Sequence, residues 1–261
     1  MDEVHPVVER VPGGAGRAIA AALGLGLGAP IAFLLVTSVL QSVIPALSSL
    51  LQGIVLLGLL LLAPWLILGG TAFGYLAYRG LDWTGMREYL GIRIPSIRAL
   101  AVVLGGWILI FGLIFVLGAI LQTLGAQPAE NQTGEVARQL PALIPFLIVY
   151  MFIVVGPVEE LLYRGVVQGR LRESLGPIPS IAIASAVFAA VHWFALVGGA
   201  SGRLITIAVL FVPSLVFGAV YEYTENIVAC ALLHALHNSG LLVLLYIATQ
   251  IDGSTATLLL G

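Results

Sequence analysis

The sequence predicts an all-α fold, a bundle of about seven helices that cross a membrane. Hydrophobic residues make up 60% of the 261 residues and charged residues only 9%, whereas a soluble domain carries charge on about a quarter of its positions. The mean hydropathy is +1.08, and the apolar residues come in runs of about twenty, the length that crosses a hydrocarbon layer about 30 Å thick. A lipid bilayer is therefore the expected surrounding of most of the chain.

Seven apolar runs are the expected membrane spans. They cover residues 18–40, 53–78, 99–124, 140–163, 180–197, 204–221 and 227–247. The first run contains Gly24, Gly26, Gly28 and Pro30, so it has the lowest helix propensity of the seven. It is too long for the core of a signal peptide and lacks a clear cleavage site, so we expect it to be retained.

The spans divide the chain into four parts. A cytoplasmic segment, residues 1–17, precedes helices and an arginine-bearing cytoplasmic loop in residues 18–139. Residues 140–248 form the core helices, and residues 249–261 form a short tail. Because no soluble domain is evident at either end, we expect the function to lie within the membrane bundle.

Arginine placement predicts the orientation. All eleven basic residues are arginines, and short cytoplasmic loops carry the basic excess in membrane proteins. Nine would lie on the side of the N-terminus, and two, Arg138 and Arg203, would lie opposite. The nine are Arg10, Arg17, Arg79, Arg87, Arg93, Arg98, Arg164, Arg170 and Arg172. We therefore expect a cytoplasmic N-terminus and, with an odd number of spans, a C-terminus on the other side. A net charge of -2 predicts no nucleic-acid partner.

Polar and ionisable residues within spans are candidate functional residues, because each costs about 2.5–3.5 kcal/mol on insertion. Few residues qualify. They are Glu159 and Glu160 in the fourth span, His192 in the fifth, and His234, His237 and Asn238 in the seventh. The single cysteine, Cys230, has no partner for an intramolecular disulfide and is typical of a small buried packing residue.

Helix spacing separates the two glutamates. Glu160 lies four residues before Arg164, so the two can form an ion pair along the helix. Glu159 is turned about 100° away, and its own neighbour at four residues is Tyr163, which brings no counter-charge. An unpaired carboxylate among apolar residues is typical of a general base.

The histidines fall on two other helices. In "FAAVHW", Phe188 and His192 share one helix face, and in "HALHN", His234 and Asn238 share another. At 1.5 Å per residue, His192 would lie about 18 Å from Ser180, deeper than Glu159 or His234. The three groups would meet only if the fifth helix begins lower or tilts.

These segments resemble three motifs of one family. "EELLYR" is similar to E-E-x-x-x-R, "FAAVH" to F-x-x-x-H and "HALHN" to H-x-x-x-N, the motifs of the CPBP (CAAX protease and bacteriocin-processing, or Abi) intramembrane endopeptidases, which include type II CAAX prenyl proteases. The motifs come in the family's order within residues 140–247. In addition, "YLGIRIPSIRAL" resembles the arginine-bearing loop that often precedes the family core.

The resemblance implies hydrolysis of a peptide bond by a glutamate-activated water, in a cavity open toward the membrane and the cytoplasm. Glu159 would be the general base, and His192 would be the second anchor of the water. His234 and Asn238 would donate hydrogen bonds to the oxyanion of the tetrahedral intermediate, a contribution of about 2.7–4 kcal/mol per donor in hydrolases.

The resemblance also assigns the remaining residues and the partners. Glu160 and Arg164 would be an ion pair that orients the helix and tunes Glu159, while His237 lies outside the motifs and is assigned to packing. The implied partners are the lipid bilayer and a protein or peptide substrate, lipidated substrates included. No cofactor is expected.

Other interpretations remain open. Glu159, His192 and His234 are also a ligand set that catalytic zinc uses, with a fourth position for water, although the chain has no H-E-x-x-H segment and Asn238 suits an oxyanion better than a metal. The same buried groups could line a proton or ion pathway, but paired broken spans of the transporter kind are not evident. A non-catalytic membrane protein is the remaining alternative, since family membership alone does not establish activity.

Overall fold

The protein is a polytopic helical bundle, as the sequence predicts. The computed structural model describes residues 14–250, and within them seven helical segments are long and apolar enough to cross a membrane. These segments are Gly14–Ala46, Ser49–Tyr78, Ile97–Thr123, Pro141–Arg172, Pro177–Ala195, Ala200–Thr224 and Ile227–Gln250. The first of them is continuous in spite of its glycines and Pro30. Arg10 and the tail beyond residue 250 lie outside the described residues.

The N-terminal half of the chain supplies three spans and a short crossing helix. Its elements are α1 (Gly14–Val43), the 3-10 turn η1 (Ile44–Ala46), α2 (Ser49–Pro64), the π-helical segment η2 (Trp65–Gly69), α3 (Gly70–Tyr78), α4 (Trp83–Leu90) and α5 (Ile97–Thr123). The expected arginine-bearing loop thus contains a helix, α4, which begins at the side-chain cap of Asp82 and ends at Gly91.

The connection from α5 to the next span is here named the strap, residues 125–139. It contains β1 (Glu130–Asn131) and α6 (Gln132–Gln139).

The span after the strap is one long helix, here named the motif helix, Pro141–Arg172. It consists of η3 (Pro141–Leu143), α7 (Ile144–Tyr150), η4 (Met151–Val155), α8 (Gly156–Glu160), η5 (Leu161–Gln168) and α9 (Gly169–Arg172), of which η4 and η5 are π-helical. The remaining elements are α10 (Pro177–Val191), η6 (His192–Ala195), β2 (Leu196–Val197), α11 (Ala200–Thr224) and α12 (Ile227–Gln250).

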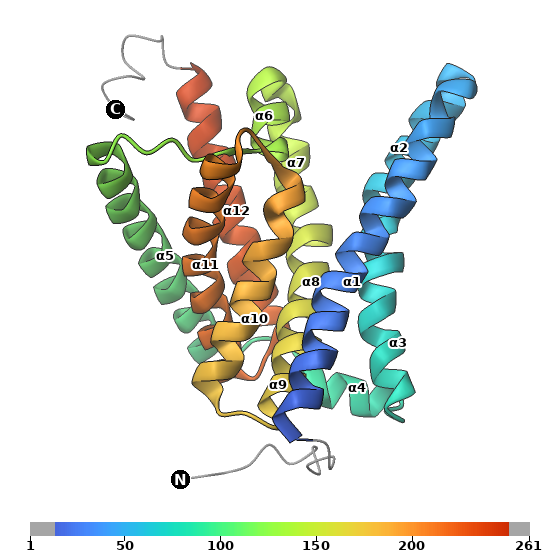
Figure 1. Ribbon diagram of the computed structural model, residues 1–261, viewed down its shortest axis with the longest axis vertical. Helices are drawn as coiled ribbons and strands as arrows, with labels where there is room; N and C mark the ends of the chain where they lie inside the picture. The colour runs from blue at the N-terminus through green and yellow to red at the C-terminus, as the bar shows by residue number, and fades with distance from the viewer. Residues whose placement is uncertain (1–13, 251–261) are drawn as a thin grey trace.

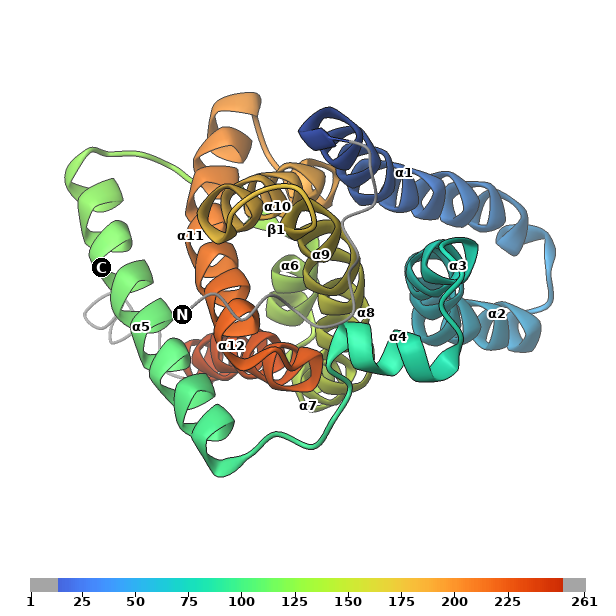
Figure 2. The same cartoon turned by 90° about the horizontal axis from the view of Figure 1, so that it is seen from below.

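The helices surround the motif helix. Figure 1 shows the start of α1 at the lower end, with α4 lying across that end and the strap crossing the upper end. Seen from below in Figure 2, α1 to α3 lie on one side of the cluster formed by α7 to α12, and α5 lies on the other. We name the two ends of the bundle the N-terminal end and the strap end.

Proline and glycine shape the motif helix just before the two glutamates. Pro157 has no N–H to donate to the carbonyl four residues earlier, that of Ile153, and the indole Nε1 of Trp65 donates to this carbonyl at 3.2 Å. Gly156 lets α12 approach closely, because a Cβ at this position would lie 2.8 Å from the carbonyl oxygen of Ala231. The helix is therefore fitted to η2 on one face and to α12 on another.

The strap is fixed to the upper ends of α10 and α11. β1 and β2 pair antiparallel, with Asn131 opposite Leu196. The hydroxyl of Thr206 donates to the carbonyl of Ala129 at 2.8 Å, and the amide of Ala129 donates to Gly202 at 3.0 Å. These bonds attach the strap to the segment that follows α10.

The N-terminal end is closed by packing and by charge pairs. Glu173 accepts from the guanidinium groups of Arg79 and Arg170 and from the hydroxyl of Tyr89. Burial and the charge of Glu173 raise the pKa of Tyr89 well above its ordinary value. Burial lowers the pKa of Arg79, but the hydrogen bond and charge of Glu173 outweigh it, and the net direction is upward.

The structure corrects the placement of Arg164. The sequence predicts that this residue follows the fourth span. The motif helix instead continues to Arg172, and the side chain of Arg164 is fully buried inside the bundle. Arg164 therefore carries no information about orientation.

Candidate active site

The buried ion pair that helix spacing predicts is present. Nη1 of Arg164 donates to Oε1 of Glu160 at 3.0 Å, and both side chains are fully buried. Nη2 donates to the carbonyl and the hydroxyl of Ser214 at 3.1 and 2.7 Å. The guanidinium also lies over the rings of Phe188 and Phe217, 4.6 and 5.3 Å from their centroids. Arg164 thus joins the motif helix to α10 and α11.

Glu160 also holds His234. Its Oε1 lies 2.7 Å from Nδ1 of His234, and its Oε2 accepts from the thiol of Cys230 at 2.9 Å. A carboxylate paired with arginine can only accept hydrogen bonds, so Nδ1 of His234 carries a proton and its Nε2 is directed elsewhere. Sequence spacing cannot reveal this contact, because it joins two helices 74 residues apart.

Glu159 lies in a different environment from Glu160. Among residues 14–250 its carboxylate has no hydrogen-bond partner, and Nε2 of His234 lies 4.0 Å from its Oε2. Its side chain is 26% exposed. The exposed part lines a cavity of about 260 Å³.

The cavity brings Glu159 and His192 together. Its wall is mainly apolar and is formed by α1, by the α2–η2 junction, by the motif helix and by the end of α10. Nδ1 of His192 lies 2.7 Å from the carbonyl of Phe188, which can only accept, so the proton is on Nδ1 and a neutral His192 has a bare Nε2. The motif helix continues to Arg172, so Glu159 lies about 20 Å from its lower end, a depth comparable with that of His192, which removes the mismatch expected from counting residues.

His237 and Asn238 lie next to this arrangement on α12. His237 is buried, with its ring at edge-on angles to Phe111 and Phe217, as its assignment to packing requires. The amide nitrogen of Asn238 is directed to the thioether of Met151 at 3.7 Å. The structure therefore brings Glu159, Glu160, Arg164 and His234 together and places His192 on the same cavity, while the amide of Asn238 is turned to Met151.

Sequence reasoning missed several residues that build the site. Gln132 of the strap lines the cavity and donates to the carbonyl of Phe194 at 3.4 Å, two residues after His192. Trp65 and Ser214 support the motif helix through the bonds described above. A signal exists for a donor such as Trp65, since Pro157 within a span leaves the carbonyl of Ile153 without its helical donor, whereas no sequence signal points to Ser214.

The zinc alternative finds no ligand group in the described part of the chain. No three His, Cys, Asp or Glu side chains of residues 14–250 are grouped so that they could hold one metal ion. Nδ1 of His234 is occupied by Glu160 and Nδ1 of His192 by Phe188.

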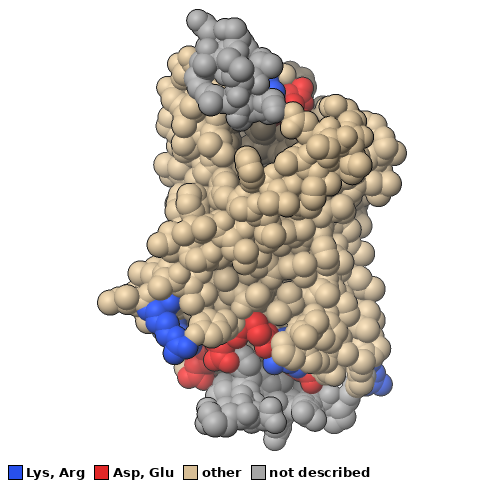
Figure 3. All heavy atoms as spheres, turned by 90° about the vertical axis from the view of Figure 1, so that its left-hand side faces the viewer, with Lys and Arg blue, Asp and Glu red and all other residues tan. Residues whose placement is uncertain are grey.

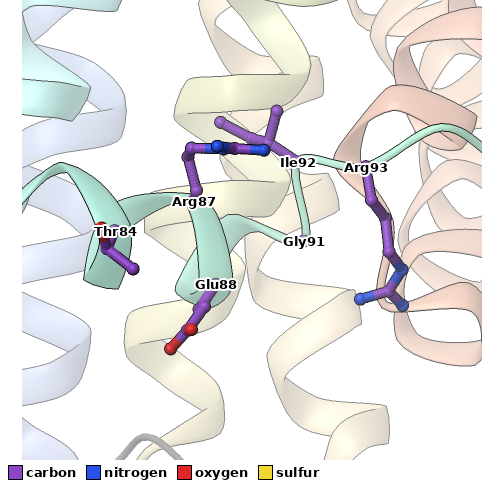
Figure 4. A pocket seen from close by; sticks show the side chains of 6 residues that line it. All are labelled: Thr84, Arg87, Glu88, Gly91, Ile92 and Arg93. Carbon is purple, nitrogen blue, oxygen red and sulfur yellow. The ribbon is translucent and has the colours of Figure 1, made fainter.

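A second cavity, of about 310 Å³, lies at the N-terminal end (Figure 4). It is lined by α4 and the residues that follow it, and by none of the motif residues. The side chains of Arg87 and Arg93 extend in different directions in Figure 4, so they do not converge on one ligand.

Comparison with known proteins finds a family to which the core of the chain is similar. Residues 141–240 match the family model described as type II CAAX prenyl endopeptidase Rce1-like. No match is found among curated proteins or among solved structures. The matched residues run from the start of the motif helix into α12, so they contain all three motifs, Glu159 to Arg164, Phe188 to His192 and His234 to Asn238. The chain is an integral, multi-pass membrane protein, and its residues 141–240 are similar to the type II CAAX prenyl endopeptidase Rce1-like family.

Proposed function

We propose that the protein hydrolyses peptide bonds with a water molecule that Glu159 activates. One observation carries the proposal. Of the two adjacent glutamates, Glu160 is saturated by Arg164, His234 and Cys230, whereas Glu159 has no hydrogen-bond partner in the described chain and faces a cavity that it shares with His192. A carboxylate held in this way is free to bind a water and to take its proton.

The proposed step begins with a water between Glu159 and Nε2 of His192. Glu159 takes one proton as the water oxygen forms a bond to the carbonyl carbon of the peptide, and the carbonyl electrons move onto its oxygen. When the tetrahedral intermediate collapses, the carbon–nitrogen bond breaks and Glu159 returns the proton to the leaving amine. The products are a carboxylic acid and an amine, and no redox partner or co-substrate other than water is needed.

His234 and Asn238 are the proposed donors to the oxyanion. Because Nδ1 of His234 already donates to Glu160, Nε2 can donate only when the ring carries both protons. The two glutamates, Arg164 and a protonated His234 would then have a total charge of zero. Asn238 would have to turn from Met151, and a thioether is a weak acceptor, so little is lost when the amide leaves it.

Glu160 and Arg164 are proposed as positioning residues rather than reacting groups. Glu160 fixes the ring of His234, and Arg164 neutralises Glu160 and ties the motif helix to Ser214 of α11. The apolar wall of the cavity favours substrates that carry hydrocarbon, such as lipidated peptides or peptide segments within the bilayer.

A reconstituted cleavage assay tests the proposal. Purified protein in liposomes is offered a farnesylated peptide and unmodified leader-type peptides, and products are read by mass spectrometry. Wild-type protein should cleave at least one of them. Glu159→Gln should remove nearly all turnover, while Glu135→Gln, which changes a half-buried glutamate of α6 that bonds Gln139 in the described chain, should keep it. Full turnover in Glu159→Gln would refute the assignment.

Two further variants separate the oxyanion mechanism from a zinc site. Asn238→Ala should lower the catalytic rate constant by about 10²–10³ with little change in substrate affinity. A zinc site predicts a near-normal rate constant for Asn238→Ala, together with stoichiometric zinc in the wild type that His234→Ala loses. Metal analysis of the purified proteins before and after chelation distinguishes the two.

A further inference from the structure

We propose that Tyr150 is a further substrate-binding residue, whose hydroxyl donates a hydrogen bond to a main-chain carbonyl of the peptide within about four residues of the cleaved bond. Tyr150 thereby favours an extended peptide segment that is long enough to reach it. The inference rests on the function proposed above, because it gives a second point of contact to the peptide that Glu159 acts on.

Tyr150 lines the cavity that contains Glu159 and His192. It is the last residue of α7 and lies nine residues before Glu159, a separation of about 13 Å along the helix. The charge of Glu159 acts on the hydroxyl of Tyr150, so the two polar groups are within electrostatic range of each other. An extended chain covers about 13 Å in about four residues. A peptide that runs along the motif helix from Glu159 therefore reaches Tyr150.

The packing of Tyr150 uses its ring and not its hydroxyl. The ring is stacked on that of Phe146, with the ring centroids 6.5 Å apart and the planes at 12°. Tyr150 is half-buried, and among residues 14–250 its hydroxyl has no hydrogen-bond partner. A phenylalanine would make the same stacking contact. The hydroxyl is therefore available to a group that does not belong to the chain.

The other polar side chains of the cavity are less available as donors. The hydroxyl of Tyr163 and the Nδ1 proton of His192 are directed to backbone carbonyls, and an ionised Glu159 can only accept. Gln132 donates one N–H to a backbone carbonyl and keeps another, but its side chain is exposed. Among the buried and half-buried side chains that line the described cavity, Tyr150 is the one with a donor free for a substrate.

A peptide held for hydrolysis needs such a donor. The bond that is cleaved has to be open to water, so the main chain around it is unwound and its carbonyls have no helical partners. The cavity wall is mainly apolar. Figure 3 shows charged side chains only near the two ends of the face that it draws, as expected of a bundle whose middle lies in hydrocarbon. In these surroundings an unpaired carbonyl is costly, and the hydroxyl of Tyr150 removes that cost for one carbonyl.

Tyr150→Phe deletes only the hydroxyl and tests the proposal. In the liposome assay it should raise KM by about 2- to 10-fold, as expected for the loss of one neutral hydrogen bond, with little change in kcat. Tyr246→Phe is the matched control, because Tyr246 is an exposed residue of α12 that does not line the cavity. It should behave as wild type. An unchanged KM in Tyr150→Phe would overturn the proposal.

Direct binding and unfolding separate substrate contact from a structural role. In a Glu159→Gln background, which should bind peptide without cleaving it, a fluorescent farnesylated peptide should bind about 2- to 10-fold more weakly after Tyr150→Phe. Tyr150→Phe should unfold at the temperature of the wild type, whereas Tyr163→Phe, which loses its bond to Gly26, should unfold at a lower one. Equal losses of stability in the two variants would mean that the Tyr150 hydroxyl serves the fold, contrary to the proposal.

Peptides with a single ester link locate the carbonyl that Tyr150 binds. Replacing one main-chain amide by an ester makes its carbonyl a weaker acceptor. One such ester, within about four residues of the cleaved bond, should weaken binding to the wild type and have a smaller effect on Tyr150→Phe, in which the partner of that carbonyl is already gone. If every ester has the same effect in both proteins, the hydroxyl contacts no main-chain carbonyl and the inference is wrong.

The outcomes distinguish this inference from the proposed function. If wild-type protein binds the farnesylated peptide without cleaving it, and Tyr150→Phe weakens that binding, the proposed hydrolysis fails while the binding role of Tyr150 stands. If a peptide is cleaved and Tyr150→Phe matches the wild type in KM and in binding, the function stands and the inference fails. Absence of both binding and cleavage would overturn both.

Discussion

Two adjacent glutamates have different environments because one helix residue turns a side chain by about 100°. Glu160 faces α12, where the imidazole of His234 and the thiol of Cys230 contact it, and its own helix supplies the guanidinium of Arg164. Glu159 faces the cavity and has only a distant neighbour in His234. Replacing Glu160 should therefore change the stability of the fold, and the same replacement at Glu159 should change the rate of peptide hydrolysis.

Glu160→Gln should destabilise the protein strongly. It leaves the buried guanidinium of Arg164 without its counter-charge, and breaking a buried pair on one side costs about 3–5 kcal/mol. Thermal unfolding in detergent measures the loss, with Glu159→Gln as the matched control that should unfold close to wild type. Equal losses in the two variants would contradict the division of roles between them.

Sequence alone predicts some of these residue contacts. The pair of Glu160 and Arg164 follows from a spacing of four within one helix, and the same spacing predicts that Glu159 is unpaired. The bond from Glu160 to His234 and the contact with Cys230 cannot be predicted in this way, because they depend on how α12 packs against the motif helix. The direction of the Asn238 amide toward Met151 is likewise a tertiary feature.

At the scale of a single element, the motif helix depends on a donor from another helix. Pro157 removes one backbone N–H two residues before Glu159, and Trp65 of η2 donates to the carbonyl of Ile153. An unpaired carbonyl on this exposed, lipid-facing surface would find no water to donate to it, so the indole stabilises the part of the motif helix that precedes Glu159.

Trp65→Phe should lower the free energy of unfolding by about 1–3 kcal/mol, because it removes the indole donor and keeps an aromatic ring. In a Pro157→Ala background the same change should cost less, since the introduced alanine has an N–H for the carbonyl of Ile153. A double-mutant cycle by thermal unfolding measures the difference. If Trp65→Phe costs the same in both backgrounds, the indole does not compensate for the proline.

The sequence predicts the positions of the spans well but predicts some helix boundaries poorly. Apolar runs locate all seven spans, since hydrophobicity of sufficient length is a strong signal. The sequence predicts that the motif helix ends near residue 163, because an arginine after an apolar run is typical of a loop. The buried partners of Arg164 are not evident from the sequence. The sequence predicts a loop in place of α4, because this helix is short and polar. Asp82 and Gly91 are nevertheless capping signals of a helix.

At the scale of the whole molecule, the N-terminal helices line a cavity whose motif residues come from other helices. The matched residues 141–240 carry the motif side chains, but α1, α2 and the strap supply much of the cavity wall. The two parts meet closely where α4 ends. Gly91 has a φ of +64°, and a Cβ at this position would lie 1.9 Å from the carbonyl oxygen of Glu225, between α11 and α12.

Gly91→Ala should therefore destabilise the whole bundle. The left-handed backbone alone costs an alanine about 1–2 kcal/mol, and the contact with Glu225 adds to it. Gly80→Ala is the matched control, because Gly80 also has a positive φ but no atom within 4 Å of its Cβ position. Thermal unfolding should show a clearly larger loss at Gly91, and similar losses at the two positions would indicate that α4 can shift without cost.

The sequence predicts the helical architecture of the whole molecule better than it predicts the position of the cavity beside Glu159. Composition alone predicts a helical membrane bundle, and the motifs predict the family to which residues 141–240 are similar. The position of the cavity depends on the divergence of α1 from the motif helix, on Gln132 in the strap and on the packing of Tyr163 against Gly26, none of which has a sequence signature. The cytoplasmic position of the N-terminus remains a prediction.

The π-helical segment η4 has a consequence for insertions and deletions. A π segment within an α-helix amounts to one extra residue, and η4 lies between α7 and the glutamates of α8. Deleting one residue from Met151–Val155 would turn this segment into ordinary α-helix and leave α7 facing nearly the same direction relative to Glu159, because five π-helical residues complete about the same rotation as four α-helical ones. The spacing from Glu159 to Arg164 would be untouched. Chain length on the N-terminal side of the glutamates can therefore vary by one residue without changing the motif and without re-orienting the strap.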